Sequence, residues 1–417
     1  MQKAPKETSL TREWVYALLP AGVFVYMVHN LGFPIGNLPA YLGGLCLTTA
    51  GLLAYKPKPR IEGRLRQAFK YSSLYTTSGE GKINYPILRG KEGVKNGVRL
   101  KYGLPIGMCV SDFIGQWERL EQAVNGEINF QNVKGGILME VLFGELPEER
   151  GFYFPDFPDY QLGIPIGFSR TGLITADLAE MPHLLVAGQT YGGKSVFLHG
   201  AVACLLRNPT VDLFLIDLAR AEFSYVKDHA DFSYTVEDSV KTLSFLHTEM
   251  EERLNILDRY KIEKIQNYPH DDLPYLVLVV DEFSALSPSL IKDRKNPEKK
   301  LRDECHFLLT DLLSRARKVG IHIILSTQRP DKDVLPGILK ANIPATICFK
   351  VRNRVNSEIC LDHGRAAMLP DIKGRAIWQF QEEREVQVMH LSPTQARSLL
   401  PSSPKKSANS LFENGEF

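Results

Sequence analysis

The sequence has 417 residues, of which 44% are hydrophobic and 24% charged, and this composition excludes a chain that is disordered throughout. Its length suits two or three domains. The formal net charge is only +2, so no global field marks a nucleic-acid-binding protein and any basic surface must be local. The six cysteines are scattered without a CxxC pair, which argues against a disulfide scaffold and a zinc knuckle.

Two uncharged apolar stretches in residues 1–55 predict an N-terminal membrane anchor of two transmembrane helices. They cover residues 14–28 and 38–55, and each is close to the minimum length of a membrane-spanning helix. Lysines and arginines precede the first stretch and follow the second, whereas the connecting segment has none. The positive-inside rule then predicts a multi-pass protein of the cell membrane with both termini in the cytoplasm. A cleaved signal peptide would explain one apolar run but not two, and a buried core hairpin is the other alternative.

A basic cytoplasmic linker over 56–81 is expected to join the anchor to a small α/β accessory domain over 82–150. Within this domain, residues 98–102 alternate like a half-buried strand and residues 137–142 have the pattern of another. Ser111 fits the N-cap of a helix that continues to position 124. No motif for chemistry occurs in this domain.

The segment 163–395 alternates apolar strand patterns with helical patterns, which predicts an α/β fold with a mostly parallel sheet and helices on both faces. The expected strands lie at 184–187, 213–217, 276–281, 321–326 and 345–351, and the expected helices start at 194 or cover 236–260 and 301–318. The polar tail over 402–417 is expected to be disordered.

The first motif of the core has the pattern G-x-x-x-x-G-K-S between a predicted strand and a predicted helix. It consists of Gly188, Gln189, Thr190, Tyr191, Gly192, Gly193, Lys194 and Ser195. Backbone N–H groups of such a loop surround phosphates, and the helix that follows adds its positive end. Lys194 is expected to reach the β- and γ-phosphates and the Ser195 hydroxyl to bind Mg²⁺, so ATP and Mg²⁺ are the predicted cofactors. A Gly-rich turn is the alternative.

The second motif is an apolar predicted strand that ends in two carboxylates, Asp281 and Glu282. Asp281 is expected to hold the Mg²⁺, and Glu282 to polarise the attacking water as a general base. A carboxylate pair at a strand end is by itself unspecific and is usually a solvated turn. The G-x-x-x-x-G-K-S motif upstream, which is the pattern of a P-loop, favours the catalytic interpretation.

Two further catalytic residues are predicted around the strand at 321–326. Gln328 follows this strand, where its amide could sense the γ-phosphate. Arg317 precedes the strand and is a candidate arginine finger, which would act on the nucleotide of a neighbouring subunit because its charge must approach the phosphoryl group from outside. The alternative for Arg317 is a cation that complements a helix C-terminus.

Taken together, these motifs resemble the motor domain of FtsK/SpoIIIE DNA translocases. The resemblance is carried by residues 179–188, 280–283, 316–330 and 339–344. It implies a RecA-like P-loop ATPase core, a homo-hexameric ring and ATP hydrolysis that drives DNA through a pore. With two spans, a small domain and no orientation-reading module after the core, the chain resembles the compact FtsK-like coupling proteins of conjugative elements. That resemblance implies a relaxase and membrane channel proteins as partners.

The chain departs from the family pattern at two places. The family loop is usually Gly-Thr-Thr-Gly-Ser-Gly-Lys-Ser, and here Tyr191 replaces the first inner glycine. If that position needs a positive φ, Tyr191 is strained. The family's Asp-Pro-Lys after the second strand is Asp217-Leu218-Ala219, so a lysine is missing and Arg220 is a candidate replacement.

DNA contacts must come from local basic clusters, because the net charge is small. The candidates are Lys292, Arg294, Lys295, Lys299 and Lys300 in one loop, and Lys350, Arg352 and Arg354 beyond a core strand. The alternative for each cluster is a solvated loop. The leading hypothesis is a membrane-anchored DNA translocase that serves a conjugative channel. The alternatives are an FtsK-like ATPase for chromosome segregation or protein secretion, and a weakly active ATP-binding membrane scaffold.

Overall fold

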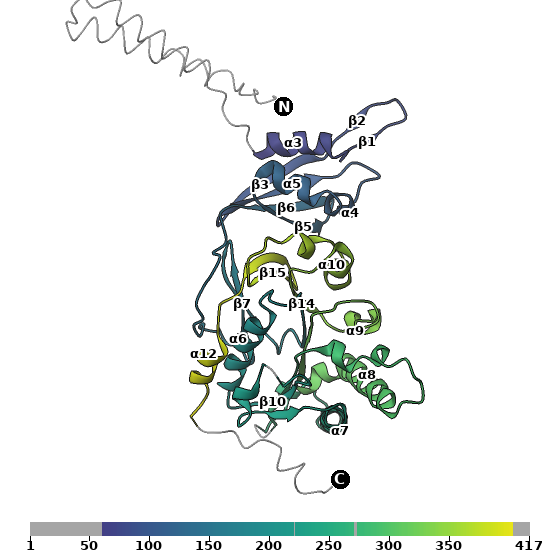
Figure 1. Cartoon of the computed structure of the whole chain (residues 1–417). Helices are drawn as coiled ribbons and strands as arrows, with labels where there is room; N and C mark the ends of the chain where they lie inside the picture. The colour runs from purple at the N-terminus through teal and green to yellow at the C-terminus, as the bar shows by residue number, and fades with distance from the viewer. Residues whose placement is uncertain (1–60, 221, 271–272, 403–417) are drawn as a thin grey trace, which may run out of the picture. The chain divides into compact units, whose positions relative to one another are not determined.

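The computed structural model describes residues 61–402 apart from 221 and 271–272 (Figure 1). The chain divides into two units, Met1–Ala68 and Phe69–Phe417, and helix α3 (Ile61–Tyr71) contains the boundary. The predicted spans at 14–28 and 38–55 lie outside the described residues. In the part of the chain that is described, no helix has the length and apolar character needed to cross a membrane.

The accessory domain is built on a four-stranded antiparallel sheet with the order β3-β4-β6-β5. Its strands are β3 (Ile87–Val94), β4 (Gly97–Gly103), β5 (Glu127–Val133) and β6 (Gly136–Leu142), preceded by the short pair β1 (Thr76–Thr77) and β2 (Ile83–Asn84). Between β4 and β5, the expected single helix is two short ones, α4 (Val110–Ile114) and α5 (Trp117–Val124). Cys109 rather than Ser111 is the N-cap of α4. Phe113, Leu120 and Val124 are buried, so these helices supply apolar core residues to the domain.

The core contains a ten-stranded sheet with the order β11-β10-β12-β13-β9-β14-β15-β16-β7-β8. The strands are β7 (Gly163–Ser169), β8 (Gly172–Asp177), β9 (His183–Ala187), β10 (Val211–Ile216), β11 (Asp231–Ser233), β12 (Tyr275–Val280), β13 (Ile321–Thr327), β14 (Ala345–Phe349), β15 (Arg375–Gln379) and β16 (Glu383–Gln387). From β11 to β14 every pairing is parallel, as the alternating pattern predicted for all of these strands except the short β11, which had not been predicted. The remaining strands pair antiparallel and had not been predicted.

Helices cover both faces of the parallel part of the sheet. Helix α6 (Lys194–Leu206) packs with Leu184, Val186 and other residues of one face, while α7 (Val236–Tyr260) and α8 (Pro297–Arg315) pack with the alternate residues on the other. Because each strand is buried on both faces, it has an apolar run instead of an alternating pattern. Shorter helices complete the domain: η2 (Ser224–Val226), η3 (Ile265–Asn267), η4 (Phe283–Leu286), η5 (Pro288–Leu290), η6 (Ala316–Val319), α9 (Gly337–Ala341), α10 (Arg354–Leu361), α11 (Arg365–Met368) and α12 (Pro393–Ser398).

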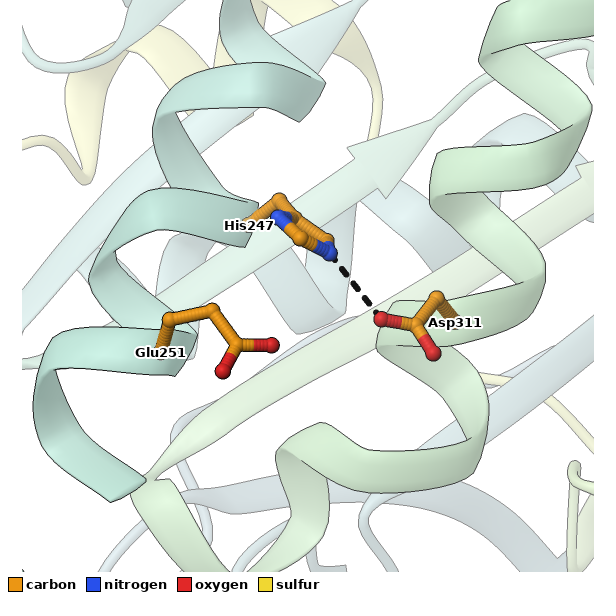
Figure 2. Close-up of side chains that lie close together, drawn as sticks. All are labelled: His247, Glu251 and Asp311. Atoms are coloured by element: carbon orange, nitrogen blue, oxygen red, sulfur yellow. Dashed lines mark hydrogen bonds and ion pairs between the residues drawn. The ribbon is translucent and has the colours of Figure 1, made fainter. Parts of the chain in front are cut away.

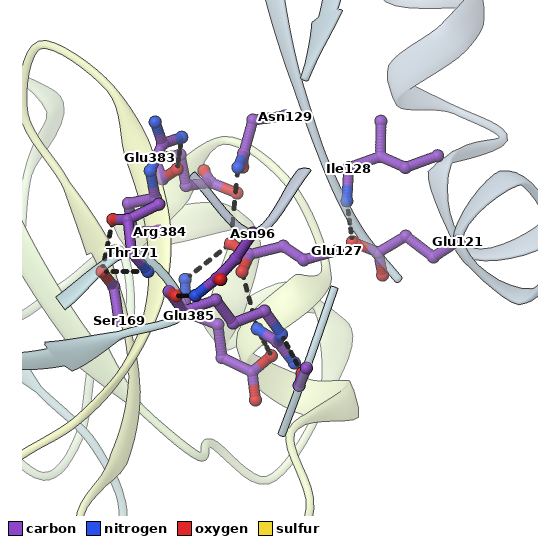
Figure 3. A network of polar contacts seen from close by, with 12 residues as sticks. Asn96, Glu121, Glu127, Ile128, Asn129, Ser169, Thr171, Glu383, Arg384 and Glu385 are labelled. Carbon is purple, nitrogen blue, oxygen red and sulfur yellow. Dashed lines mark hydrogen bonds and ion pairs between the residues drawn. The ribbon is translucent and has the colours of Figure 1, made fainter. Parts of the chain in front are cut away.

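A network of buried ion pairs joins the accessory sheet to the antiparallel edge of the large sheet (Figure 3). Arg170 Nη1 lies 2.6 Å from Glu127 of β5 and 3.0 Å from Glu385 of β16. The Glu385 backbone N–H donates to Glu127 at 2.9 Å, and Arg384 Nη2 lies 2.5 Å from Glu140 of β6. The side chains are largely removed from water, with Glu127 only 1% exposed. The two sheets are therefore held together by ion pairs, and each buried charge depends on its partner for stabilisation.

Replacing Arg170 by methionine is expected to lower the free energy of unfolding by about 3–5 kcal/mol, because the buried Glu127 carboxylate loses its cation. Urea unfolding of the full chain measures this. The matched control is Arg99→Met, since Arg99 also pairs across strands but is 41% exposed, and its loss should cost less than about 1 kcal/mol. Adding Glu127→Gln to the Arg170 variant should restore part of the stability. Equal costs for Arg170 and Arg99 would contradict this interpretation.

Candidate nucleotide-binding site

The predicted motifs meet at one edge of the large sheet. The P-loop follows β9, the two carboxylates follow β12 and Gln328 follows β13. These parallel strands are neighbours in register, with Val280 opposite Leu325 and Thr327 opposite Ala187. Because parallel strands end at the same edge, side chains that are far apart in the sequence come together there.

The P-loop is fixed by close contact with two backbone segments. A Cβ atom at Gly188 would lie 2.5 Å from Phe349 Cβ, and one at Gly193 would lie 2.7 Å from Gly374 Cα. Gly193 also has φ 114° and is the N-cap of α6. The loop is bonded on both sides, through Gln189 N–H to the Lys350 carbonyl at 2.9 Å and through Gly374 N–H to the Gly192 carbonyl at 2.8 Å. Glycine is required at both positions for steric reasons, which leaves the backbone to face a ligand.

Tyr191 has φ 66° and is 88% exposed. The position therefore does need a positive φ, and the backbone of Tyr191 is strained, as expected for that case. A non-glycine residue held in this region costs on the order of 1–3 kcal/mol. Tyr191→Gly is therefore expected to raise the free energy of unfolding by about 1 kcal/mol, after the extra freedom of glycine in the unfolded chain is subtracted.

The measurement for Tyr191→Gly is urea unfolding, with Tyr153→Gly as the control. Tyr153 is also an exposed tyrosine, but it does not have a positive φ, so glycine there should destabilise the protein. A loss of stability in both variants would show that the Tyr191 backbone is not strained.

Lys194 lies among the strand-end carboxylates. Its side chain is 5% exposed, and Nζ donates to the Asp281 carbonyl and to Ser326 Oγ, both at 2.8 Å. Nζ also lies 3.8 Å from Asp281 Oδ1 and 3.7 Å from Glu282 Oε2. This places the ammonium at the junction of the P-loop, β12 and β13.

Glu282 is oriented by the end of β13. It accepts hydrogen bonds from the Gln328 backbone N–H at 2.8 Å and from Thr327 Oγ1 at 2.9 Å, and its Oε1 also accepts from Ser284. The Thr327-Gln328 pair thus has a second use that sequence reasoning missed, which is to hold the carboxylate in place. The Gln328 side chain accepts from Thr190 Oγ1 at 2.6 Å, so the strand end is also linked to the P-loop.

Asp281 has the properties of a cation ligand. It is 7% exposed, and Oδ1 has no hydrogen-bond partner within the described residues. Burial raises the pKa of Asp281 to about 6, although Lys194 opposes this rise. A buried carboxylate oxygen in this position is stabilised by a cation, so the residues fit Mg²⁺ held by Ser195 and Asp281.

Two acidic residues after β10 were not predicted as site residues. Ile216 is opposite Val280, so Asp217 follows β10 as Asp281 follows β12. Asp217 and Glu222 both lie close enough to raise the pKa of Asp281. The signal in the sequence was a strand-end aspartate, which only the strand order identifies as a neighbour of Asp281.

Arg317 is not brought to this site. It lies in η6, before β13 begins, and lines a hollow of about 1000 Å³ with Asp177, Glu263 and Lys318. This is the opposite edge of the sheet, so Arg317 cannot reach the nucleotide of its own chain. Its role toward a neighbouring subunit stays a prediction.

The candidate DNA-binding residues differ in their exposure and in whether they already bond to other residues of the chain. Lys292, Arg294, Lys295, Lys300 and Arg352 are exposed. Lys299 donates to the carbonyls of Pro288 and Ile291, Lys350 lies 3.1 Å from Asp371, and the exposed Arg354 lies 2.7 Å from Glu358. Lys299 and Lys300 lie in α8 rather than in the predicted loop. Among the residues that the structure describes, the segment 292–300 still offers the larger group of exposed basic side chains without an ion-pair partner.

A separate cluster of His247, Glu251 and Asp311 joins α7 to α8 (Figure 2). His247 Nε2 lies 3.0 Å from Asp311, and their ligand-type atoms lie within 4.8 Å of one another. However, Arg315 Nη1 lies 2.6 Å from Glu251 and 2.9 Å from Asp311. Since the arginine already neutralises both carboxylates, we interpret the cluster as an ion-paired helix contact.

The strand order, the P-loop and the paired carboxylates define a P-loop ATPase domain. Residues 159–272 match the model of the FtsK/SpoIIIE family. The resemblance seen in the sequence is thus confirmed: the chain carries an FtsK/SpoIIIE-type ATPase domain.

Curated relatives agree with this assignment. The DNA translocase FtsK of Chlorobaculum tepidum is 31% identical over 294 residues, which is 61% of this chain and 35% of the relative. FtsK of Campylobacter jejuni is 35% identical over 216 residues, 48% of this chain and 22% of the relative. The chain thus matches about a third or less of the length of these relatives.

Solved structures show the same fold. The pCW3 conjugation coupling protein TcpA, in its monomer form with ATPγS, is similar with a TM-score of 0.58 and 21% identity, over 82% of this chain and 99% of that one. The cytoplasmic domain of the type VII secretion ATPase EccC from Thermomonospora curvata has a TM-score of 0.50 and 20% identity, over 61% and 33% of the two chains.

Proposed function

We propose that this protein is a membrane-anchored, ATP-driven DNA translocase that acts as a coupling protein and delivers DNA to a conjugative transfer channel. The observation that carries the proposal is the nucleotide site itself, in which the P-loop, Lys194, Asp281, Glu282 and Gln328 meet at one sheet edge within an FtsK/SpoIIIE-type domain. The FtsK relatives are named as DNA translocases, which supports DNA as the substrate of this chain.

Each residue of the nucleotide site has a separate role in the proposed hydrolysis of ATP. The backbone of 188–195 binds the phosphates, and Lys194 exchanges its bonds to Asp281 and Ser326 for the β- and γ-phosphates. Glu282, held by Thr327 and Gln328, accepts a proton from the attacking water. Bound Mg²⁺ neutralises charge on the phosphates, and Ser195 and Asp281 would hold it. The link from Gln328 to Thr190 couples the end of β13 to the occupied loop.

The coupling role is supported by the similarity to TcpA, which covers 82% of this chain. Protein secretion is the second candidate, because the secretion ATPase EccC shares the fold. A homo-hexamer is supported by Arg317, which lies opposite the P-loop edge and could serve only another subunit's nucleotide. A relaxase and channel proteins are the partners that this role requires.

The decisive experiment measures ATP hydrolysis by the full-length chain with duplex DNA, single-stranded DNA or no DNA. We expect duplex DNA to stimulate hydrolysis and the stimulation to fall steeply with salt, because phosphate contacts release counterions. Hydrolysis should also displace a third strand from a triplex, equally in both orientations, because phosphate contacts carry no sequence information. Hydrolysis without any response to DNA would favour secretion, and absence of hydrolysis would favour the scaffold.

The proposed topology places the segment between the two spans outside the cell and residues 56–417 inside. In a cysteine-free background, a cysteine at Gly36 should react with an impermeant thiol reagent added to intact cells, because this uncharged segment is expected to cross the membrane. A cysteine at the exposed Glu80 should react only after the cells are opened. Labelling of Glu80→Cys in intact cells, with protection of Gly36→Cys, would refute the topology.

A further inference from the structure

A chain of polar side chains lies behind the P-loop and leads from η2 to Ser195. His199 follows Ser195 by one turn of α6 and is 1% exposed. Its Nδ1 lies 2.9 Å from the Tyr225 hydroxyl, and its Nε2 lies 3.5 Å from Glu222 Oε2. The pKa of Glu222 is lowered mainly by His199, and Ser195 contributes to this as a hydrogen-bond donor. If Nε2 carries the proton and faces Glu222, Nδ1 accepts a hydrogen bond from Tyr225, so both ring nitrogens have a polar partner.

This arrangement matters for a serine that binds a cation. A hydroxyl group has one proton and two lone pairs, so a serine that offers a lone pair to a metal needs an acceptor for its proton. Glu222 is such an acceptor, and His199 and Tyr225 fix its position. Side chains that orient metal ligands in this way commonly change metal affinity about 10–100-fold when they are removed.

Asp217 supplies an independent observation at the same place. It follows β10, beside the β12 strand that carries Asp281, and is 1% exposed. Neither of its carboxylate oxygens has a hydrogen-bond partner among the residues that the structure describes. A buried carboxylate without a partner is costly, so this position needs a ligand that supplies protons or positive charge.

We propose that Glu222 and Asp217 are positioning residues for the Mg²⁺ of the ATP site, an inference that rests on the proposed function. Glu222, held by His199 and Tyr225, orients the Ser195 hydroxyl toward the ion. Asp217 accepts hydrogen bonds from the water that Mg²⁺ retains, because this ion usually keeps several water ligands in proteins. Neither residue belongs to the phosphate-binding loop 188–195, so their effect should be specific to the ion.

The test compares binding of a fluorescent ATPγS analogue to the full-length chain in Mg²⁺ and in EDTA. For the wild type we expect tighter binding in Mg²⁺. Glu222→Ala and Asp217→Asn should each lose about tenfold or more of this Mg²⁺-dependent gain, with little change in EDTA. Glu222→Gln should retain most of the gain, because its amide oxygen still accepts the Ser195 proton while its NH₂ group faces the His199 ring, whose nitrogens can exchange donor and acceptor roles. Glu252→Ala, an exposed glutamate on α7, is the matched control and should behave as wild type.

Three results would overturn the inference, and a fourth concerns the proposed function alone. Equal losses in Mg²⁺ and in EDTA would show that the residues only support the fold, and thermal unfolding without nucleotide checks this. An equal loss in Glu222→Gln and Glu222→Ala would exclude the orienting role. If wild type binds the analogue and the Glu222 and Asp217 variants match it, the inference fails while the nucleotide site stands. If wild type itself fails to bind, the proposed function fails first.

Discussion

Replacing Lys194 by alanine is expected to reduce ATP turnover by at least about a hundredfold. A preorganised cationic contact to developing phosphate charge contributes several kcal/mol of transition-state stabilisation. In this chain, Nζ lies within 3.8 Å of both Asp281 and Glu282, so the substitution also leaves two carboxylates without their cation. Because Lys194 lowers the pKa of Asp281, its loss should raise that pKa further and weaken Mg²⁺ binding at neutral pH.

Steady-state hydrolysis with saturating Mg-ATP measures the Lys194 effect. The control is Lys241→Ala, because Lys241 is an exposed lysine on α7 with only a surface partner. Thermal unfolding of both variants separates a loss of fold from a loss of catalysis. Wild-type turnover in Lys194→Ala would refute the P-loop assignment.

Glu282→Gln should bind Mg-ATP and hydrolyse it about 10²–10⁴-fold more slowly, since an amide cannot accept the proton of the attacking water. The structure adds a second reason for the loss. Glu282 accepts from Thr327 on one oxygen and from Gln328 on the other. An amide has a single acceptor oxygen, so one of these donors faces an NH₂ group and the side chain is displaced.

Single-turnover hydrolysis and nucleotide affinity should be measured together for Glu282→Gln. Glu252→Gln on α7 is the matched control because that side chain is exposed and has the same change in charge. If nucleotide affinity collapses while residual turnover is normal, Glu282 is a metal or fold residue and its assignment as the general base is wrong.

Several features of this protein follow from local sequence. Helix α7 covers 236–260, as its pattern predicted, because a long amphipathic segment has a clear period and its first residues are capped by Thr235. The buried parallel strands were found from their apolar runs. The P-loop and the carboxylates after β12 were found because their chemistry is set by neighbours in the chain. The positive φ of Tyr191 could be anticipated because it stands where the family has glycine.

The tertiary structure decided the features that depend on distant neighbours. The antiparallel edge was missed because β7 contains Gly163, Pro165 and Gly167, and β16 begins with three charged residues and has a single apolar one, so neither resembles a buried strand of the parallel part. The charges in β16 are tolerated there because Arg170 and residues of the accessory sheet compensate them.

The nucleotide-binding site likewise combines features set by local sequence with features set by the tertiary structure. The sequence by itself determined that a P-loop, two acidic residues and a polar Gln328 each follow a strand. Only the order and register of β10, β12, β13 and β9 placed Asp217 beside Asp281 and Glu282 against Thr327. A motif needs only the local backbone, whereas a contact between strand ends needs the whole sheet, since the strands are adjacent in space but separated by long helices in the chain.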